Sequence, residues 1–217
     1  MAVRALTFDA AGTLIAPHPG VGAVYAEVAA RHGFERDADE LERAFAPAFK
    51  AVLATWPAPY GADEADARRF WDGVIAATFA ESLPYELCCD LYDAFAQAAR
   101  WRVLPGAREA LALAARRSIP CAVVSNFDLR LHALVGQLAL GPFAAVVTSA
   151  QVGRAKPDPA PLLRACDLMG VAPRGVVHVG DSEREDGAMC TATGASWLRV
   201  DPAVGIDVAR LDALLRH

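Results

Sequence analysis

Lysine is scarce in this sequence. Of the 21 Lys and Arg residues, only Lys50 and Lys156 are lysines, and all the others are arginines. A lysine ammonium is a compact point charge, whereas an arginine guanidinium is a planar fork, so the two groups do different chemical work. In a chain that otherwise uses arginine, each lysine is a candidate for a specific role.

Other absences disfavour whole classes of protein. No apolar run approaches the ~18 residues of a membrane helix, and Asp9 interrupts the N-terminal region before a signal-like segment develops. The five cysteines are odd in number and form no CxxC pair, which argues against a disulfide framework or a zinc site. A net charge of −5 argues against a nucleic-acid surface. We therefore expect a cytoplasmic protein that binds neither a membrane nor nucleic acid.

The spacing of apolar residues predicts an α/β fold with a parallel sheet. Strand-like and helix-like stretches alternate from residue 101 onward, a pattern typical of a doubly wound sheet. The expected strands are residues 4–8, 120–126, 144–148, 175–180 and 196–200. The expected helices of this part are residues 106–117, 129–140, 159–170, 186–193 and 208–215.

A helical segment separates the first expected strand from the others. Apolar residues recur at helical spacing in residues 21–30, 38–53, 65–79 and 85–100. Residues 15–20 predict a turn, and Pro47 predicts a kink or break in the second helix. We therefore predict a core domain of residues 1–15 and 103–217, with an inserted α-helical domain at residues 16–102.

Chemically active side chains follow the expected strands. Ligands bind beyond the carboxyl ends of the strands in such a sheet. Those ends and the nearby loops carry Asp9, Ser125, Asn126, Lys156, Asp181 and Asp186. Clustered carboxylates repel one another without a cation, and hard oxygen ligands suit Mg²⁺. His178 lies within an apolar strand, and we expect it to be a hydrogen-bonded core histidine rather than a ligand.

Four motifs resemble those of the haloacid dehalogenase superfamily of hydrolases. They are Phe8–Leu14, Val123–Asn126, Lys156–Pro159 and His178–Asp186, in this order and each at a strand end. The resemblance spans the chain and is strongest to the dehalogenase-like hydrolase domain-containing branch. It implies a Rossmann-like core, a helical cap that closes over the substrate, and a phosphatase acting on a small phosphorylated molecule.

The resemblance also implies the catalytic and metal-binding residues. Asp9 would be the nucleophile and would form an aspartyl-phosphate. Asp9, the backbone carbonyl of Ala11 and Asp181 would hold Mg²⁺. Asp186 would support that metal, or the lysine, from behind the direct ligands.

The remaining matched positions are implied in phosphate binding. Ser125 and Lys156 would contact the phosphoryl group, assisted by the backbone of Asn126. Gly12 and Thr13 would shape the loop after the nucleophile. Thr13, Ser125 and Lys156 thus complete a catalytic set around the nucleophile.

Ala11 departs from the pattern of the family's phosphatases. They carry a second aspartate two residues after the nucleophile, which protonates the leaving alcohol and then activates water. General acid–base assistance is worth roughly 10²–10⁴-fold, so we expect alkyl phosphates to suffer most. Attack by Asp9 remains possible because the metal ligand at position 11 is a backbone atom. His18 and Tyr25 are candidates for a replacement acid, although a loop histidine and a core tyrosine are the simpler interpretations.

Three alternatives to a phosphatase stay open. Asp9-x-Ala11-Gly-Thr looks like the motif of phosphonoacetaldehyde hydrolases, which use a cap lysine as a Schiff base, and Lys50 lies in the expected cap. The 2-haloacid dehalogenases also lack the second aspartate, but they are metal-independent and replace the metal aspartate of the fourth motif. Asp181 and Asp186 are both present, which weighs against dehalogenation. The last alternative is a catalytically silent member that binds a phosphorylated ligand or a partner protein.

Overall fold

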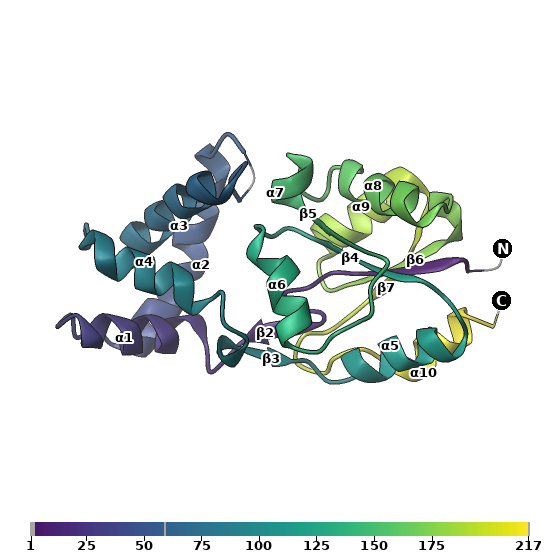
Figure 1. Cartoon of the computed structure of the whole chain (residues 1–217), viewed down its shortest axis with the longest axis horizontal. Helices are drawn as coiled ribbons and strands as arrows, with labels where there is room; N and C mark the ends of the chain where they lie inside the picture. The colour runs from purple at the N-terminus through teal and green to yellow at the C-terminus, as the bar shows by residue number, and fades with distance from the viewer. Residues whose placement is uncertain (1–2, 59, 217) are drawn as a thin grey trace.

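A parallel five-stranded sheet forms the centre of one half of the molecule (Figure 1). The computed structural model describes residues 3–58 and 60–216, so residues 1–2, 59 and 217 of the predicted domains lie outside the described residues. The strand order is β5-β4-β1-β6-β7. The strands are β1 (Ala5–Phe8), β4 (Cys121–Ser125), β5 (Ala145–Thr148), β6 (Val176–Gly180) and β7 (Ser196–Arg199). The predicted α/β class with a parallel sheet is therefore confirmed.

The central strand β1 is apolar on both sides of the sheet. Phe8 pairs in register with Val123 of β4 and Val179 of β6. Successive side chains of a strand face opposite sides, so Leu6 and Phe8 pack into one hydrophobic cluster and Ala5 into another. A parallel strand with both faces covered has a continuous apolar sequence, which is why β1 could be recognised from its residues.

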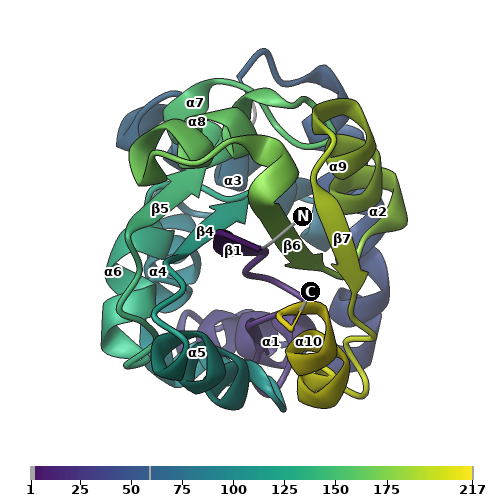
Figure 2. The ribbon, with the colours of Figure 1, turned by 90° about the vertical axis from the view of Figure 1, so that its right-hand side faces the viewer.

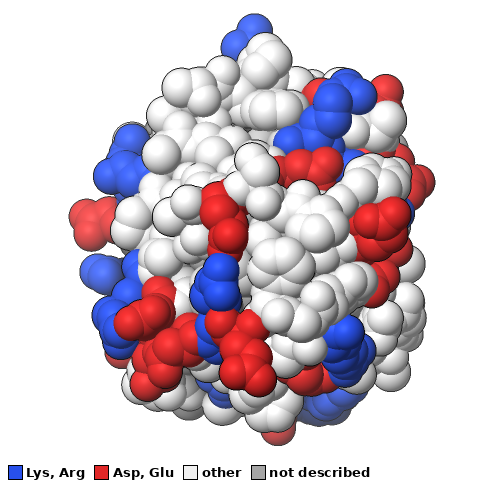
Figure 3. Space-filling view, turned by 90° about the vertical axis from the view of Figure 1, so that its left-hand side faces the viewer, with Lys and Arg blue, Asp and Glu red and all other residues white. Residues whose placement is uncertain are grey.

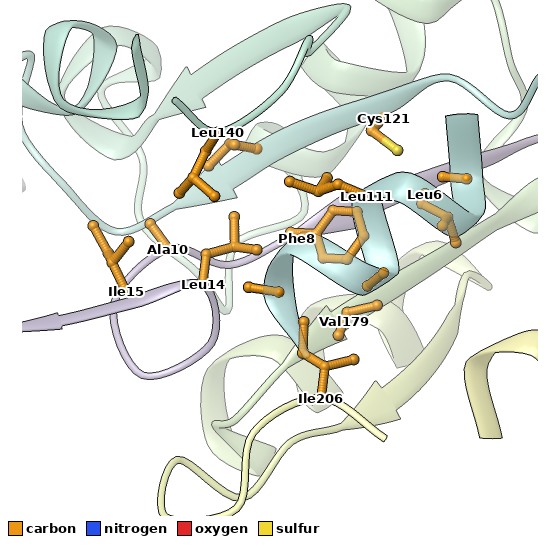
Figure 4. Close-up of a cluster of buried hydrophobic side chains, with 14 of the residues drawn as sticks. Leu6, Phe8, Ala10, Leu14, Ile15, Leu111, Cys121, Leu140, Val179 and Ile206 are labelled. Atoms are coloured by element: carbon orange, nitrogen blue, oxygen red, sulfur yellow. The ribbon is translucent and has the colours of Figure 1, made fainter. Parts of the chain in front are cut away.

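Helices cover both faces of the sheet (Figures 1 and 2). One face is covered by α5 (Ala107–Arg116), α6 (Arg130–Gln137) and α10 (Val208–Leu214). The other face is covered by α8 (Ala160–Met169) and α9 (Ala188–Thr193), and the short α7 (Ser149–Val152) follows β5. Figure 4 shows the first face, where the ring of Phe8 lies beside Leu111 of α5 and near Val179. The doubly wound arrangement follows from these two apolar layers.

Four helices form a block beside the sheet, which we call the helical block (Figure 1). They are α1 (Val21–Arg31), α2 (Ala38–Thr55), α3 (Glu64–Phe79) and α4 (Tyr85–Ala94). Aspartates begin two of them, because the side chain of Asp37 accepts a hydrogen bond from the N–H of Glu40, and Asp63 does the same for Asp66. A two-stranded antiparallel ribbon, β2 (Ile15–Pro17) with β3 (Trp101–Val103), joins the block to the core.

Three local predictions were wrong. Residues 15–17 were expected in a turn but form β2, because Ile15 is buried in the core and β3 supplies backbone partners. Pro47 does not break α2, which continues from Ala38 to Thr55 and packs against both α1 and α3. The expected helix 85–100 ends at Ala94, and only residues 98–100 resume as a 3₁₀ turn.

The outer surface of the helical block carries charges of both signs. Acidic and basic side chains are interspersed on the face shown in Figure 3. Several of them pair, as in Arg31–Glu27, Arg36–Glu81 and Arg68–Asp93. Within residues 3–58 and 60–216, no helix combines the length and the apolar character that a bilayer crossing needs.

Candidate active site

Asp9 and Lys156 form a buried ion pair at the carboxyl edge of the sheet. Asp9 follows β1 directly and is 8% exposed, and Lys156 is 3% exposed. Oδ1 of Asp9 accepts a hydrogen bond from the N–H of Ala10 at 2.8 Å and lies 2.8 Å from Nζ of Lys156. Both contacts fall on the same carboxylate oxygen. Because an isolated buried charge is costly, each group offsets the cost of burying the other, and one of the two lysines of the chain supplies the cation.

Asp186 anchors Lys156 from the other side. Oδ1 of Asp186 accepts a hydrogen bond from Nζ of Lys156 at 2.6 Å and lies 2.9 Å from Nε2 of His178. Its Oδ2 accepts a hydrogen bond from the N–H of Ser182 at 3.0 Å. Burial alone would raise the pKa of Asp186, but the hydrogen bond from His178 and the charge of Lys156 lower it well below its usual range. Asp186 is therefore a fixed anion with both oxygens already engaged.

The lysine between these carboxylates keeps its charge. Burial alone would lower the pKa of Lys156, but the charges of Asp9 and Asp186 raise it above its ordinary value. The site thus presents a permanent cation beside the carboxylate of the first motif.

His178 is the hydrogen-bonded core histidine that its sequence context predicted. It is fully buried, and its Nδ1 lies 2.8 Å from Oγ1 of Thr7 on the neighbouring strand. Its contact with Asp186 was not foreseen. The register of β1 and β6, which sets Thr7 opposite His178, is the feature that orients the ring.

Asp181 completes a cluster of three carboxylates. It follows β6 directly, and Oγ1 of Thr13 donates a hydrogen bond to its Oδ1 at 3.2 Å. Burial and the charges of Asp9 and Asp186 raise the pKa of Asp181. One oxygen from each of Asp9, Asp181 and Asp186 lies within 4.8 Å of the others. Three clustered carboxylates beside a single lysine carry an excess of negative charge, and such hard oxygen groups are suited to a divalent cation.

Two glycines allow the loops around this cluster to approach closely. Gly12 has φ of 85°, and a Cβ there would lie 2.8 Å from Oδ2 of Asp181. At Gly180, a Cβ would lie 2.4 Å from Cγ of Asp186. Glycine is therefore required at position 12 both by the backbone conformation and by the neighbouring carboxylate.

Asn126 holds the loop that carries Lys156. Its Oδ1 accepts a hydrogen bond from the N–H of Lys156 at 2.7 Å, and its Nδ2 donates to the carbonyl of Lys156 at 3.0 Å. Nδ2 also donates to Oε2 of Glu185 at 3.0 Å, and burial raises the pKa of the Glu185 carboxyl. Ser125, the last residue of β4, is 1% exposed beside it. These side-chain hydrogen bonds could not be predicted from local sequence pattern, since the partners lie 30 and 59 residues away.

A cavity of about 230 Å³ lies between the helical block and these core loops. Ala11 and Asn126 line its core end, and Tyr25 of α1 lines the opposite wall. The other candidates from the helical segment lie elsewhere. His18 and Lys50 are exposed, and neither is among the described residues that line the cavity.

Comparisons with known proteins show which family the chain resembles. A family model described as haloacid dehalogenase-like hydrolase matches residues 3–194. Haloacid dehalogenase-like hydrolase domain-containing protein 3 of Homo sapiens is 34% identical over 189 residues, which cover 83% of this chain and 74% of that protein. The phosphoserine phosphatase of Thermus thermophilus is 32% identical over 191 residues, covering 82% of this chain and 76% of that protein.

A solved structure shares the fold. The L-2-haloacid dehalogenase from Xanthobacter autotrophicus superposes with a TM-score of 0.70 at 24% identity, covering 91% of this chain and 77% of that one. The family model spans most of the chain, and its residues include all of the expected site positions, from Asp9 to Asp186. The chain therefore belongs to the haloacid dehalogenase-like hydrolase family.

Proposed function

We propose that this protein is a magnesium-dependent phosphomonoester hydrolase that uses Asp9 as its nucleophile. Residues 1–15 and 103–217 would form the catalytic core, and residues 16–102 a cap that closes over a small phosphorylated substrate. The observation that carries the proposal is the Asp9–Lys156 ion pair inside a cluster of three carboxylates. The relative named a phosphoserine phosphatase also supports it.

The first step is a displacement at phosphorus. Ala10 and Lys156 both contact Oδ1 of Asp9, which leaves Oδ2 to attack. The bond from Oδ2 to phosphorus forms as the bond from phosphorus to the alcohol oxygen breaks, and the leaving alkoxide takes a proton from water. Water then attacks the aspartyl-phosphate, which restores Asp9 and releases inorganic phosphate.

The neighbouring residues position the phosphoryl group and neutralise its negative charge. Lys156, Ser125 and the backbone of residues 12 and 126 would hold phosphoryl oxygens. Thr13 keeps Asp181 in place through its hydrogen bond.

The carboxylate cluster fits the metal that this chemistry uses. Asp9, the carbonyl of Ala11 and Asp181 would be direct ligands of Mg²⁺. Asp186, whose oxygens are both hydrogen-bonded already, would support Lys156 and the site from behind. Mg²⁺ supplies positive charge that offsets the repulsion between the nucleophile and the phosphate.

Two competing hypotheses are disfavoured by particular residues. A phosphonoacetaldehyde hydrolase needs a cap lysine at the substrate, whereas Lys50 is exposed on α2. A metal-independent dehalogenase has no use for the carboxylate cluster that Asp181 and Asp186 form with Asp9. The similarity to a solved dehalogenase is one of fold.

Hydrolysis of an aryl phosphate with and without Mg²⁺, by the unmodified protein and by Asp9→Asn, tests the proposal. We expect turnover that requires both Mg²⁺ and Asp9. Release of chloride from 2-chloropropionate in the presence of a chelator would instead establish dehalogenation. Tight phosphate binding without any turnover would identify a catalytically silent member.

A further inference from the structure

The cavity beside the carboxylate cluster is walled by aromatic rings. Five of them come from the helices of the helical block: Tyr25 of α1, Phe45 and Phe49 of α2, Trp71 of α3 and Tyr92 of α4. The rings of Phe49 and Trp71 lie 5.7 Å apart between centroids. We call this space the aromatic cavity. Its volume of about 230 Å³ exceeds the ~150 Å³ of an apolar protein cavity that accepts benzene.

The aromatic cavity is continuous with the nucleophile's surroundings. Ala11, two residues after Asp9, lines its core end. Asn126 also lines it and contacts Lys156, the ion-pair partner of Asp9. Tyr60, another lining residue, is buried and lies 5.7 Å from Phe49 between ring centroids. A ligand whose phosphate lies at Asp9 can therefore extend its organic part into this cavity.

Arg130 is the sole charged side chain among the described residues that line the aromatic cavity. Its Nε and Nη2 donate to the two oxygens of Asp128 at 3.0 and 2.6 Å, and its Nη1 donates to the carbonyl of Tyr92 at 2.6 Å. Asp128 is fully buried and also accepts a hydrogen bond from Nε1 of Trp71 at 2.7 Å. The guanidinium is thus neutralised by a buried carboxylate and stacked 3.9 Å from the centroid of Tyr92. It is poorly disposed to bind a second anionic group of a substrate.

We propose that the substrates are phosphomonoesters of apolar alcohols, with an alkyl or aryl body that fills the aromatic cavity. This inference rests on the proposed phosphatase function. Ala11 fits it, because its methyl group adds to the apolar lining of the cavity, whereas an aspartate there would place a charge against the apolar body of the substrate. The substrate class excludes phosphorylated amino acids and sugars, whose polar groups would lose their water on entering.

A series of n-alkyl phosphates tests the substrate class on the unmodified protein. Ethyl, butyl and hexyl phosphate share the same leaving-group chemistry and differ only in apolar surface. We expect kcat/KM to rise about fourfold for each added methylene, the equivalent of ~0.8 kcal/mol, until the cavity is full. O-phosphoserine should be a poorer substrate than ethyl phosphate. Equal kcat/KM across the series, or a preference for O-phosphoserine, would overturn the inference while leaving the phosphatase function intact.

Binding of an alcohol without phosphate gives a readout that is independent of turnover. 1-Naphthylmethanol should bind the unmodified protein in calorimetry with a negative heat-capacity change, because it buries apolar surface. Val21→Trp, at a cavity-lining position of α1, should weaken that binding at least tenfold by filling the space. Val204→Trp is the matched control, since Val204 is 71% exposed. Circular dichroism verifies that both variants fold. If Val21→Trp does not fold, the n-alkyl phosphate series on the unmodified protein still tests the substrate class.

The two measurements separate the two proposals. If no phosphate is hydrolysed but 1-naphthylmethanol binds the unmodified protein and not Val21→Trp, the phosphatase proposal fails and the apolar ligand class stands. If phosphates are hydrolysed but 1-naphthylmethanol does not bind, the apolar class fails.

Discussion

The side-chain amide of Asn126 forms hydrogen bonds with both the N–H and the carbonyl of Lys156. Its Oδ1 accepts from the N–H of Lys156 at 2.7 Å, and its Nδ2 donates to the carbonyl of the same residue at 3.0 Å. This pair of bonds fixes the backbone from which the lysine reaches Asp9 and Asp186. Asn126 follows β4 and Lys156 lies in the loop before α8. The two hydrogen bonds therefore hold two loops at the carboxyl edge of the sheet together in one site.

Replacing Asn126 with leucine should displace the lysine loop. Each lost hydrogen bond to a partly buried backbone group costs about 1 kcal/mol, and a displaced Lys156 no longer holds the phosphate. We expect a decrease in kcat/KM for aryl phosphate of about 10-fold or more, since small misplacements in an active site are costly, together with a lower melting temperature. Gln151→Leu, an exposed amide, is the control. Activity equal to that of the control would contradict a positioning role for Asn126.

The two lysines of the chain offer a matched comparison. Lys156→Met leaves Asp9 and Asp186 without their shared cation, and breaking a buried ion pair in this way costs roughly 3–5 kcal/mol. We expect that loss in urea unfolding, along with the loss of Asp9-dependent turnover. Lys50→Met removes the exposed lysine and should change stability by less than about 0.5 kcal/mol. Equal stabilities of the two variants would show that the buried pair does not support the fold.

Asp181→Asn should have opposite effects with and without Mg²⁺. The charges of Asp9 and Asp186 contribute to the raised pKa of Asp181, so removal of its charge relieves repulsion and should raise the melting temperature of the metal-free protein. The same change removes a metal ligand, so the increase in melting temperature that Mg²⁺ gives the unmodified protein should disappear. Asp167→Asn, on the exposed side of α8, controls for the loss of one negative charge. A normal Mg²⁺ response in Asp181→Asn would exclude this residue as a ligand.

The sequence predicted the features that depend on local pattern and on strand ends. Buried parallel strands have continuous apolar sequences, so β1 and β6 were located, and the polar residues after them were expected to meet. The structure brings Asp9, Asp181 and Asp186 within one cluster. The rarity of lysine singled out Lys50 and Lys156 alike. Of the two, Lys156 lies in a buried ion pair with Asp9, whereas Lys50 is exposed on α2.

Features that depend on distant neighbours could not be predicted. The strand at residues 15–17 exists because β3 lies beside it, about 85 residues later in the chain. α2 continues through Pro47 while packing against two other helices, α1 and α3. In each case the contact that determines the structure involves residues distant in the sequence, which the local spacing of apolar residues cannot predict.

Ala11→Asp should alter activity differently for polar and apolar substrates. The new carboxyl group would supply the acid that protonates a leaving alcohol, an effect worth roughly 10²–10⁴-fold when the group is well placed. It would also put a charge at the core end of the aromatic cavity, which Ala11 lines. We therefore expect kcat/KM to rise for ethyl phosphate and to rise less for hexyl phosphate. The hexyl-to-ethyl ratio of kcat/KM, measured in parallel for both proteins, should therefore be lower for Ala11→Asp than for the unmodified protein, by up to about 10-fold or ~1.4 kcal/mol. An unchanged rate with ethyl phosphate would show that the missing acid does not limit the reaction, and an unchanged ratio would show that the apolar body does not lie against residue 11.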